Sequence, residues 1–211
     1  TGGCIFCSSQ GSGDFSGSAR LSIAEQIRQG KADISSKRPV HSYIAYFQAF
    51  TNTYAPVETL RALYMEAIAD PEVKILSIAT RPDCLGADVL ALLDEINQIK
   101  PVWVELGLQT IHPETSGYEL TVFEQAVKEL RAIGITVIVH TILYLPGETK
   151  DDMLDTIHYL NHMDIQGIKL QLLHVLTHTD LAADYEKHPF YIPDMQDYIQ
   201  FLGTCIAHLN P

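Results

Sequence analysis

The chain has 211 residues, of which 46% are hydrophobic, and it carries a formal net charge of −12 at pH 7. This length suffices for one domain with a full hydrophobic core and is too short for two large domains. Nucleic-acid readers are usually basic, so the acidic charge argues mildly against an RNA partner. Four cysteines, only two of them close in sequence, do not form the disulfide framework of a secreted protein, and we expect a reducing, cytoplasmic setting.

The chain opens with TGGCIFCSSQGSGDFSG, which places Cys4 and Cys7 in a C-x-x-C spacing among glycines and serines. Such a pair can bind zinc, cycle as a disulfide, or supply part of an iron–sulfur site. Zinc needs four tight ligands, and no second C-x-x-C or histidine pair follows at finger spacing. A thioredoxin-like dithiol opens a helix directly, whereas this loop continues for about ten more residues. The pair taken alone favours none of the three strongly.

Five apolar runs recur along the chain at intervals of about 30 residues, the length of a βα unit. They are YIAYFQAF, VKILSIAT, VWVELGLQ, ITVIVHTILYL and IKLQLLHVL, which start at Tyr43, Val73, Val102, Ile135 and Ile168. Most lack a clean period of two, which is typical of strands buried on both faces of a parallel sheet. The longest apolar stretch, IGITVIVHTILYLPG, is too short and too polar to span a bilayer, so we expect no membrane association.

Helical patterns lie before and between these runs. ARLSIAEQIRQG is expected to end at Gly30, while VETLRALYMEAIAD and ADVLALLDEINQI each stop before a proline. YELTVFEQAVKELRAIG closes on Gly134 as a helix C-cap. TKDDMLDTIHYLNHM begins with Thr149 and Asp152, which form a capping box.

Repeated βα units indicate a parallel sheet, and both an open Rossmann-type sheet and a barrel fit this rhythm. Each run ends in polar residues, in QAFTNT, ATRPD, LQTIHPE, LPGET and HVLTHT. In a barrel these ends surround one mouth, where βα-barrel enzymes carry their chemistry. We therefore predict one α/β domain over residues 1–211, a partial parallel (β/α)6-type TIM-like barrel. Since the chain starts without Met, in the cysteine loop, we expect its first strand to lie upstream of Thr1.

Five motifs, in this order along the predicted barrel, carry a family resemblance: GGCIFCSSQGSGDFSG, YFQAFTNTYAP, ATRPDCL, VELGLQT and LPGET. Together they resemble the radical S-adenosylmethionine (SAM) enzymes, in the branch related to oxygen-independent coproporphyrinogen oxidase and the catalytic subunit of Elongator. The resemblance covers nearly the whole chain. It implies a [4Fe-4S] cluster that cleaves bound SAM to a 5′-deoxyadenosyl radical. It also implies an electron donor such as flavodoxin or ferredoxin.

The resemblance assigns roles to the opening loop. Cys4 and Cys7 correspond to the last two of three cluster cysteines, with the first expected upstream of Thr1, and Phe6 corresponds to the aromatic residue that packs toward the adenine. The chain departs from the family after Ser116, where relatives usually carry an Asn-Arg segment. We expect that residues are missing at this point.

Further SAM contacts are implied at the strand ends. They are Gln48, Thr51, Asn52, Thr80, Glu105 and Gln109. The Gly-Gly-Glu motif that many relatives use for the SAM amino group is absent at the first three positions. Gln48 and Gln109 can instead form hydrogen bonds inside a barrel core. Glu105 lies within an apolar strand, where a buried carboxylate needs a partner.

Three other polar features have a structural and a functional interpretation. His140, inside a strand, is expected to be a hydrogen-bonded core or rim group rather than a metal ligand. Arg81 and Asp83 either pair with each other or meet a substrate. Cys84 lies at the predicted mouth as either a reactive thiol or a small buried hydrophobe.

The sequence thus predicts a radical SAM enzyme, and its Elongator-like character suggests modification of tRNA at a wobble uridine. Two alternatives stay open. The same cofactors can act on a small metabolite such as a porphyrin precursor. The barrel can also be a non-catalytic binding or scaffold protein, whose cysteine pair binds zinc or nothing.

Overall fold

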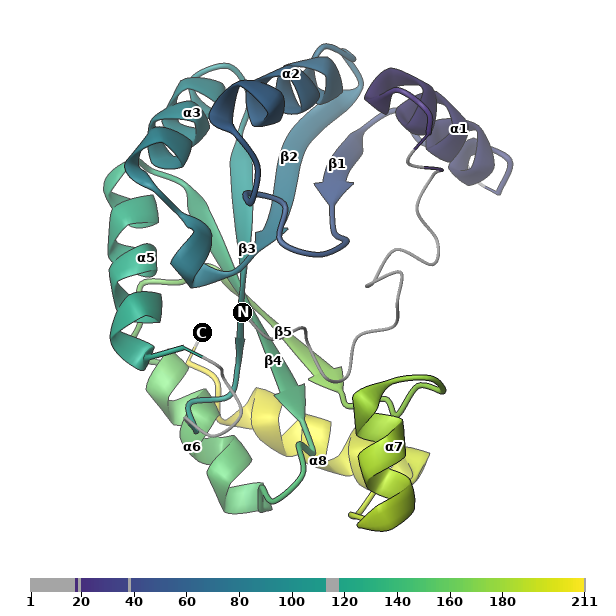
Figure 1. The fold of residues 1–211 in the computed structure, drawn as a ribbon, viewed down its shortest axis with the longest axis vertical. Coiled ribbons are helices and arrows are strands. Elements are labelled where there is room, and N and C mark those ends of the chain that lie inside the picture. Colours follow the sequence, from purple (N-terminus) through teal and green to yellow (C-terminus); the bar gives the residue numbers. More distant parts are fainter. Residues whose placement is uncertain (1–17, 19, 38, 113–117, 211) are drawn as a thin grey trace.

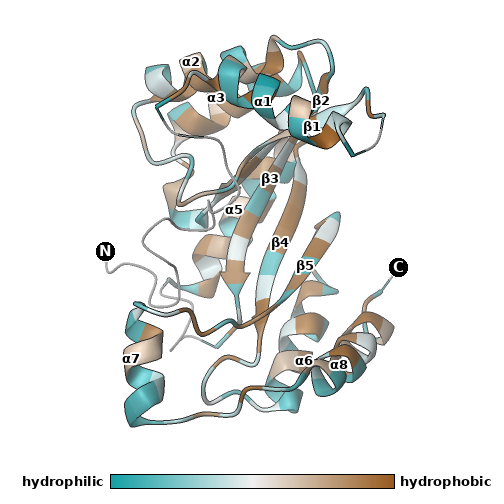
Figure 2. Ribbon diagram, turned by 90° about the vertical axis from the view of Figure 1, so that its right-hand side faces the viewer, coloured by the Kyte–Doolittle hydropathy of each residue, from teal (hydrophilic) through white to brown (hydrophobic). Residues whose placement is uncertain are grey.

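The computed structural model describes residues 18, 20–37, 39–112 and 118–210. Its centre is a parallel sheet in which each strand pairs with the next along the chain. The strands are β1 (Tyr43–Phe47), β2 (Val73–Thr80), β3 (Val102–Gln109), β4 (Thr136–Leu143) and β5 (Gly167–Leu172). The five predicted strands are confirmed. The sheet curls into a half-barrel, as the predicted partial barrel requires (Figures 1 and 2).

Helices precede, connect and follow the strands, and several of them cover one face of the sheet. They are α1 (Ile23–Ser35), α2 (Val57–Ile68), the short 3-10 helix η1 (Pro82–Cys84), α3 (Ala87–Asn97), α5 (Leu120–Ala132), α6 (Lys150–Leu160), α7 (Asp180–Lys187) and α8 (Met195–Ala207). Helices α2, α3, α5 and α6 form a curved row along the outside of the sheet (Figure 1). Within the described part of the chain, every helix is too short or too polar to cross a membrane.

The hydrophobic core lies between this row of helices and the outer face of the sheet. Alternation along β2 sends Leu76 and Ile78 into the core, both fully buried, together with Phe123 of α5. The hydropathy colouring shows mainly apolar strand bodies (Figure 2). Ser77, between Leu76 and Ile78, faces the opposite, inner side. The inner face is therefore the one on which polar side chains can gather.

Most predicted helix ends are confirmed. Gly134 follows α5 with a φ of +73°, in the left-handed region that favours glycine, and α2 and α3 both stop before their prolines. Thr149 and Asp152 form the predicted capping box of α6. Helix α7 was not predicted, because it has only eight residues and buries only Leu181, which leaves little apolar periodicity in its sequence.

The predicted end of the first helix at Gly30 is wrong, because α1 continues to Ser35. Lys31, in the turn after the glycine, binds the carboxylates of Asp70 at 2.9 Å and of Glu72. These ion pairs dock the last turns of α1 against the loop that precedes β2. Tertiary contacts thus outweigh the cost of about 1 kcal/mol for a glycine inside a helix.

We expect replacement of Thr149 by alanine to lower the free energy of unfolding by about 1 kcal/mol. The Thr149 hydroxyl accepts from the backbone N–H of Asp152, whose carboxylate accepts from the backbone N–H of Thr149 at 2.8 Å. Urea denaturation measures the change. Thr149→Ser keeps the cap and is expected to be neutral, as is Thr121→Ala at an exposed site in α5. Equal stability of Thr149→Ala and the wild type would contradict this role.

Candidate functional site

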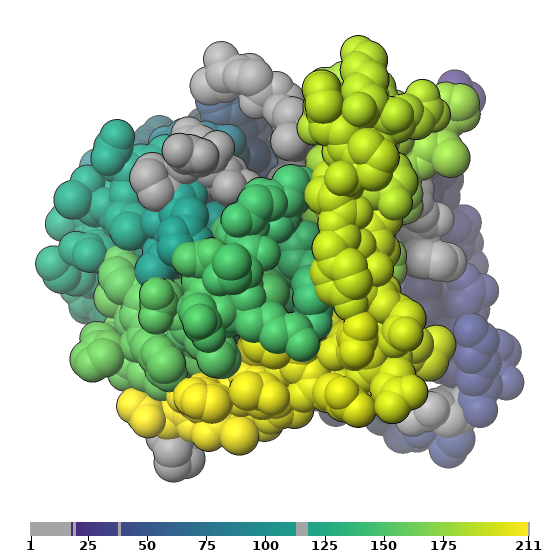
Figure 3. Space-filling model, turned by 90° about the horizontal axis from the view of Figure 1, so that it is seen from below, coloured from purple at the N-terminus to yellow at the C-terminus, as the bar shows by residue number. Residues whose placement is uncertain are grey.

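The carboxyl ends of the strands carry an unusual concentration of left-handed residues. Phe50, Gln109, Tyr144 and His178 have φ between 63° and 68°, and they follow β1, end β3, and follow β4 and β5. For a residue with a Cβ this conformation costs about 1–2 kcal/mol, and such strain collects at functional sites. Figure 3 looks onto this end of the sheet, where α6 and α7 lie in front. The strain marks this rim as the candidate site.

Glu105, in the middle of β3, is the centre of a polar cluster on the inner face of the sheet. Its side chain is 4% exposed and accepts hydrogen bonds from four strands. Ser77 Oγ donates to Oε1 at 2.6 Å, and Tyr46 OH donates to Oε2 at 2.8 Å. His140 Nε2 lies 2.6 Å from Oε2, and Lys169 Nζ also donates to this oxygen. The expected partner of the buried carboxylate and the expected hydrogen bond of His140 are both confirmed.

The cluster keeps Glu105 ionised although it is buried. Burial alone raises the pKa of the carboxyl group, but hydrogen bonds from His140, Lys169, Ser77 and Tyr46 outweigh burial and lower the pKa to about 2. Burial and the hydrogen bond to Glu105 raise the pKa of the Tyr46 phenol, which stays protonated as a donor. The inner face therefore holds a fixed negative charge surrounded by donors.

This lowered pKa predicts a loss of stability in acid. A carboxyl group with a folded-state pKa of about 2 and an ordinary unfolded pKa stabilises the folded protein above the unfolded value. We therefore expect the free energy of unfolding to fall as the pH drops from about 5 toward 2. Urea denaturation at several pH values measures the slope. Glu105→Gln is expected to flatten it, while Glu186→Gln, at an exposed position, leaves it unchanged; an unchanged slope in Glu105→Gln would contradict the prediction.

The six polar residues predicted to contact SAM fall into two groups. Gln48, Thr51 and Gln109 make no side-chain hydrogen bond with another described residue, so their polar groups are available to a ligand. Gln109 lies at the irregularity between β3 and β4, and its amide folds over Gly107, where a Cβ would come within 2.8 Å of it. An amide or hydroxyl at such a position can bind the ammonium, carboxylate or ribose groups of SAM.

Asn52, Thr80 and Glu105 are already engaged within the chain. The Asn52 amide donates to the backbone oxygens of Phe47 at 3.0 Å and Ala79 at 2.9 Å, which ties the end of β1 to the end of β2. Thr80 is buried on the helix-covered side, where its hydroxyl bonds to that of Thr53. Direct contact of these three side chains with SAM stays a prediction.

Other predicted residues lie elsewhere. Cys4, Phe6, Cys7 and the chain around Ser116 fall outside the described residues. Among the described residues, no group of three or more His, Cys, Asp or Glu side chains is arranged to hold a metal ion.

Arg81 and Asp83 pair with each other through two hydrogen bonds of 2.8 Å, which supports their structural interpretation. The pKa of the Cys84 thiol is raised by burial, by the charge of Asp83 and by the hydrogen bond to Asp83. This shift disfavours the thiolate form that a cysteine nucleophile needs.

The reasoning from sequence missed Tyr46, Ser77 and Lys169. Their signal was present, because each is a polar or amphipathic residue within an apolar strand. Alternation along β2 and β5 places Ser77 and Lys169 on the inner face, opposite to the core positions. Register then brings them together: Tyr46 pairs with Ser77, Ala79 with Glu105, and His140 with Lys169.

Glu148, in the LPGET motif, has a buried Oε1 with no hydrogen-bond partner among the described residues. Burial raises the pKa of this carboxyl group, while Thr110 and His112 oppose the rise. A protonated carboxyl group can donate a hydrogen bond at this edge of the sheet.

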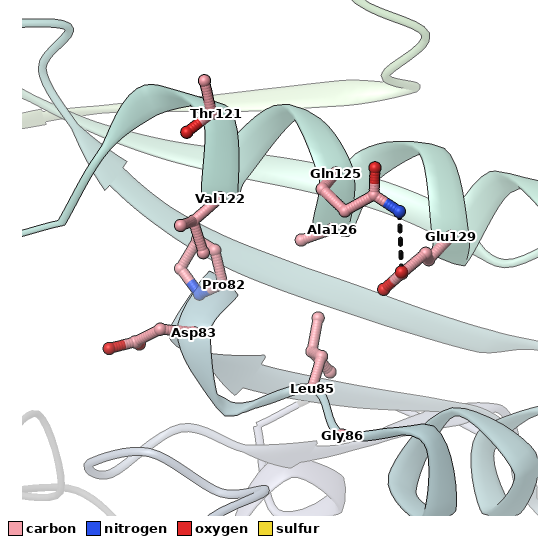
Figure 4. A pocket seen from close by; sticks show the side chains of 9 residues that line it. All are labelled: Pro82, Asp83, Leu85, Gly86, Thr121, Val122, Gln125, Ala126 and Glu129. Carbon is pink, nitrogen blue, oxygen red and sulfur yellow. Dashed lines mark hydrogen bonds between the residues drawn. The ribbon is translucent and has the colours of Figure 1, made fainter.

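A cavity of about 380 Å³ lies in the helical layer, between η1 and α5 (Figure 4). It is lined by Pro82, Asp83, Leu85, Gly86, Thr121, Val122, Gln125, Ala126 and Glu129. Its lining is mainly apolar, and Gln125 and Glu129 bond to each other at 2.7 Å (Figure 4). The cavity is separate from the inner-face cluster.

Comparison with known proteins decides the family. The family model of the radical SAM superfamily matches residues 1–160. The chain belongs to this superfamily. Among curated relatives, this radical SAM chain is 43% identical to protein YtqA of Bacillus subtilis (strain 168) and 36% identical to protein YhcC of Escherichia coli (strain K12). All of this chain is covered in both cases, and it spans 67% and 69% of those proteins.

The radical SAM fold is also seen in solved structures. The archaeal Methanocaldococcus infernus Elp3 with an N-terminal deletion superposes with a TM-score of 0.70 at 16% identity, over 87% of this chain and 48% of that one. Coproporphyrinogen III oxidase (HemN) from Escherichia coli gives 0.65 at 16% identity, over 97% and 48%. At this identity both likenesses concern the fold alone.

Proposed function

We propose that this chain binds a [4Fe-4S] cluster and SAM and cleaves SAM reductively to a 5′-deoxyadenosyl radical. The observation that carries the proposal is the rim of a radical SAM half-barrel on which Gln48, Thr51 and Gln109 keep uncommitted polar groups. Two structural neighbours support the choice of cofactors: TsrM from Kitasatospora setae was solved with a [4Fe-4S] cluster, and Streptococcus suis SuiB with SAM.

The residues take separate roles in this proposal. Cys4 and Cys7 hold the cluster as thiolates, and Phe6 packs against the adenine. Gln48, Thr51 and Gln109 bind polar groups of SAM. When bound, the cluster supplies the single electron that breaks a carbon–sulfur bond of SAM.

Asn52, Thr80 and Glu105 then act as positioning residues. Asn52 fixes the end of β1 on β2, Thr80 anchors the end of β2 through Thr53, and Glu105 organises the inner face. An electron donor such as flavodoxin or ferredoxin completes the system, which we place in the cytoplasm.

The substrate we propose is tRNA, modified at a wobble uridine. The support is the likeness in fold to Elp3, together with the Elongator-like motifs. A small metabolite is the second candidate, supported by the equally broad likeness to HemN. A gel-shift assay with bulk tRNA separates the two: specific retention, followed by a new modified nucleoside in mass spectrometry, supports tRNA, and the absence of both contradicts it.

The first experiment is anaerobic reconstitution of the full natural chain with iron and sulfide, followed by an assay for 5′-deoxyadenosine under a strong reductant. We expect cluster absorbance and SAM cleavage in the wild type and loss of both in Cys4→Ala and Cys7→Ala. Cys84→Ala is the matched control, because Cys84 is a free cysteine to which we assign no role in holding the cluster. A protein that binds zinc instead of iron and leaves SAM intact would return the chain to the scaffold class.

A further inference from the structure

Lys169 is the only lysine or arginine that the five described strands place on the inner face of the sheet. The one other cationic side chain of these strands, Lys74 of β2, has the parity of the helix-covered face and donates to the Pro71 oxygen at 2.7 Å at the strand start. In a chain with a net charge of −12, a lysine on the inner face of the described strands is a specific feature.

The Lys169 ammonium is held in place but not fully used. It donates to Glu105, lies 3.4 Å from the Tyr46 hydroxyl, and sits 4.6 Å from the centroid of the Tyr46 ring. An ammonium has three N–H donors, and 38% of the Lys169 side chain remains exposed. Ser77 and His140 also donate to Glu105, so its carboxylate does not depend on the lysine alone. At least one donor of Lys169 therefore has no partner among the described residues and is available to a ligand.

We propose that Lys169 binds a carboxylate or phosphate group of the substrate inside the barrel. Glu105 and Tyr46 act as positioning residues, because they fix the ammonium without neutralising all of its donors. An ammonium that is already oriented binds an anionic oxygen through a charge-assisted hydrogen bond. His140, 15% exposed, lies beside this ammonium, because its Nε2 bonds to the same Glu105 oxygen.

The position of Lys169 also limits the shape of the substrate. The inner-face residues that hold Lys169 lie below the rim. Tyr46 is two residues before Gln48, which follows β1, and Glu105 is four residues before Gln109, at the end of β3. At the rise of a β-strand these separations correspond to about 7–13 Å. This step rests on the proposed function, which places the reacting atoms at the rim. The substrate should therefore carry its acidic group about 7–13 Å from the atom that reacts.

The experiment titrates the full natural chain, after anaerobic reconstitution, with inorganic phosphate followed by ³¹P NMR and with succinate followed by ligand-observed ¹H NMR. Phosphate and succinate distinguish the two classes of acidic group. For at least one probe, we expect Lys169→Met to weaken binding roughly tenfold or more, the effect of one hydrogen bond to a charged group. Lys169→Arg is expected to keep binding, and Lys74→Met is the matched control at an equivalent residue outside the barrel.

Two results would overturn the inference: equal binding by Lys169→Met and the wild type, or no binding of either probe by the wild type. If circular dichroism shows that Lys169→Met is unfolded, Glu105→Gln/Lys169→Met removes both charges and replaces it. The same samples are assayed for 5′-deoxyadenosine. A wild type that cleaves SAM while Lys169→Met binds both probes normally refutes the role of the lysine alone, whereas a wild type that does not cleave SAM refutes the proposed function.

Discussion

Replacement of Glu105 by alanine is expected to lower the free energy of unfolding by about 3–5 kcal/mol. The carboxylate is 4% exposed and receives donors from β1, β2, β4 and β5. Its removal leaves a cavity and several donors without an acceptor, in addition to the uncompensated charge of Lys169. Urea denaturation at neutral pH measures the loss.

Two variants test the cause of this loss. Glu105→Gln keeps the volume and one acceptor oxygen and is expected to lose less than Glu105→Ala. Glu186→Ala, at an exposed position in α7, is expected to change stability by less than about 0.5 kcal/mol. A Glu105→Ala protein within about 1 kcal/mol of the wild type would mean that the inner-face cluster contributes little to stability.

Replacement of Tyr64 by alanine is expected to cost about 3–5 kcal/mol, the usual range for removing a large buried ring. Tyr64 of α2 is fully buried, and its ring meets that of Phe47 edge-on at 5.2 Å between centroids. Its hydroxyl donates to the backbone oxygen of Asn52 at 2.6 Å. The residue therefore supports both the core and the rim after β1.

Tyr64→Phe separates these two contributions. It keeps the ring and removes one hydrogen bond, so we expect a loss of about 1 kcal/mol. The backbone N–H of Asn52 also donates to the Ala79 oxygen. Its hydrogen exchange should accelerate in Tyr64→Phe if the Tyr64 hydroxyl stabilises the rim. Unchanged exchange, or a Tyr64→Ala protein as stable as Tyr64→Phe, would contradict this double role.

The strands and most helices could be predicted because their signals are local. These signals are the apolar runs, the prolines and the Thr149 capping box, each of which depends only on residues nearby in the sequence. They predicted the five strands and the start of α6 correctly. The end of α1 could not be predicted, since it depends on contact of Lys31 with residues about 40 positions away. Local propensity at Gly30 pointed the other way.

The candidate site was predictable in kind but not in its contacts. A buried carboxylate at Glu105 required a partner, yet its four donors come from four other strands, and their meeting depends on register. Register also decides faces: Thr80 pairs with Leu106 on the helix-covered side, whereas its neighbour Ala79 pairs with Glu105. A predicted site residue that is wrong by one position along a strand therefore lies on the opposite face of the sheet.

The strand order also has a consequence for how the chain folds. Each strand pairs only with its neighbours along the chain, so the sheet contacts join residues about 30 positions apart and can form one βα unit at a time. The contact of Tyr46 with Lys169 spans 123 residues and joins the first and last of these strands. The entropy cost of closing this long loop is offset only when all five strands are in place. The contacts around Glu105 should therefore form after the folding transition state. Substitutions in the inner-face cluster should then accelerate unfolding more than they slow folding.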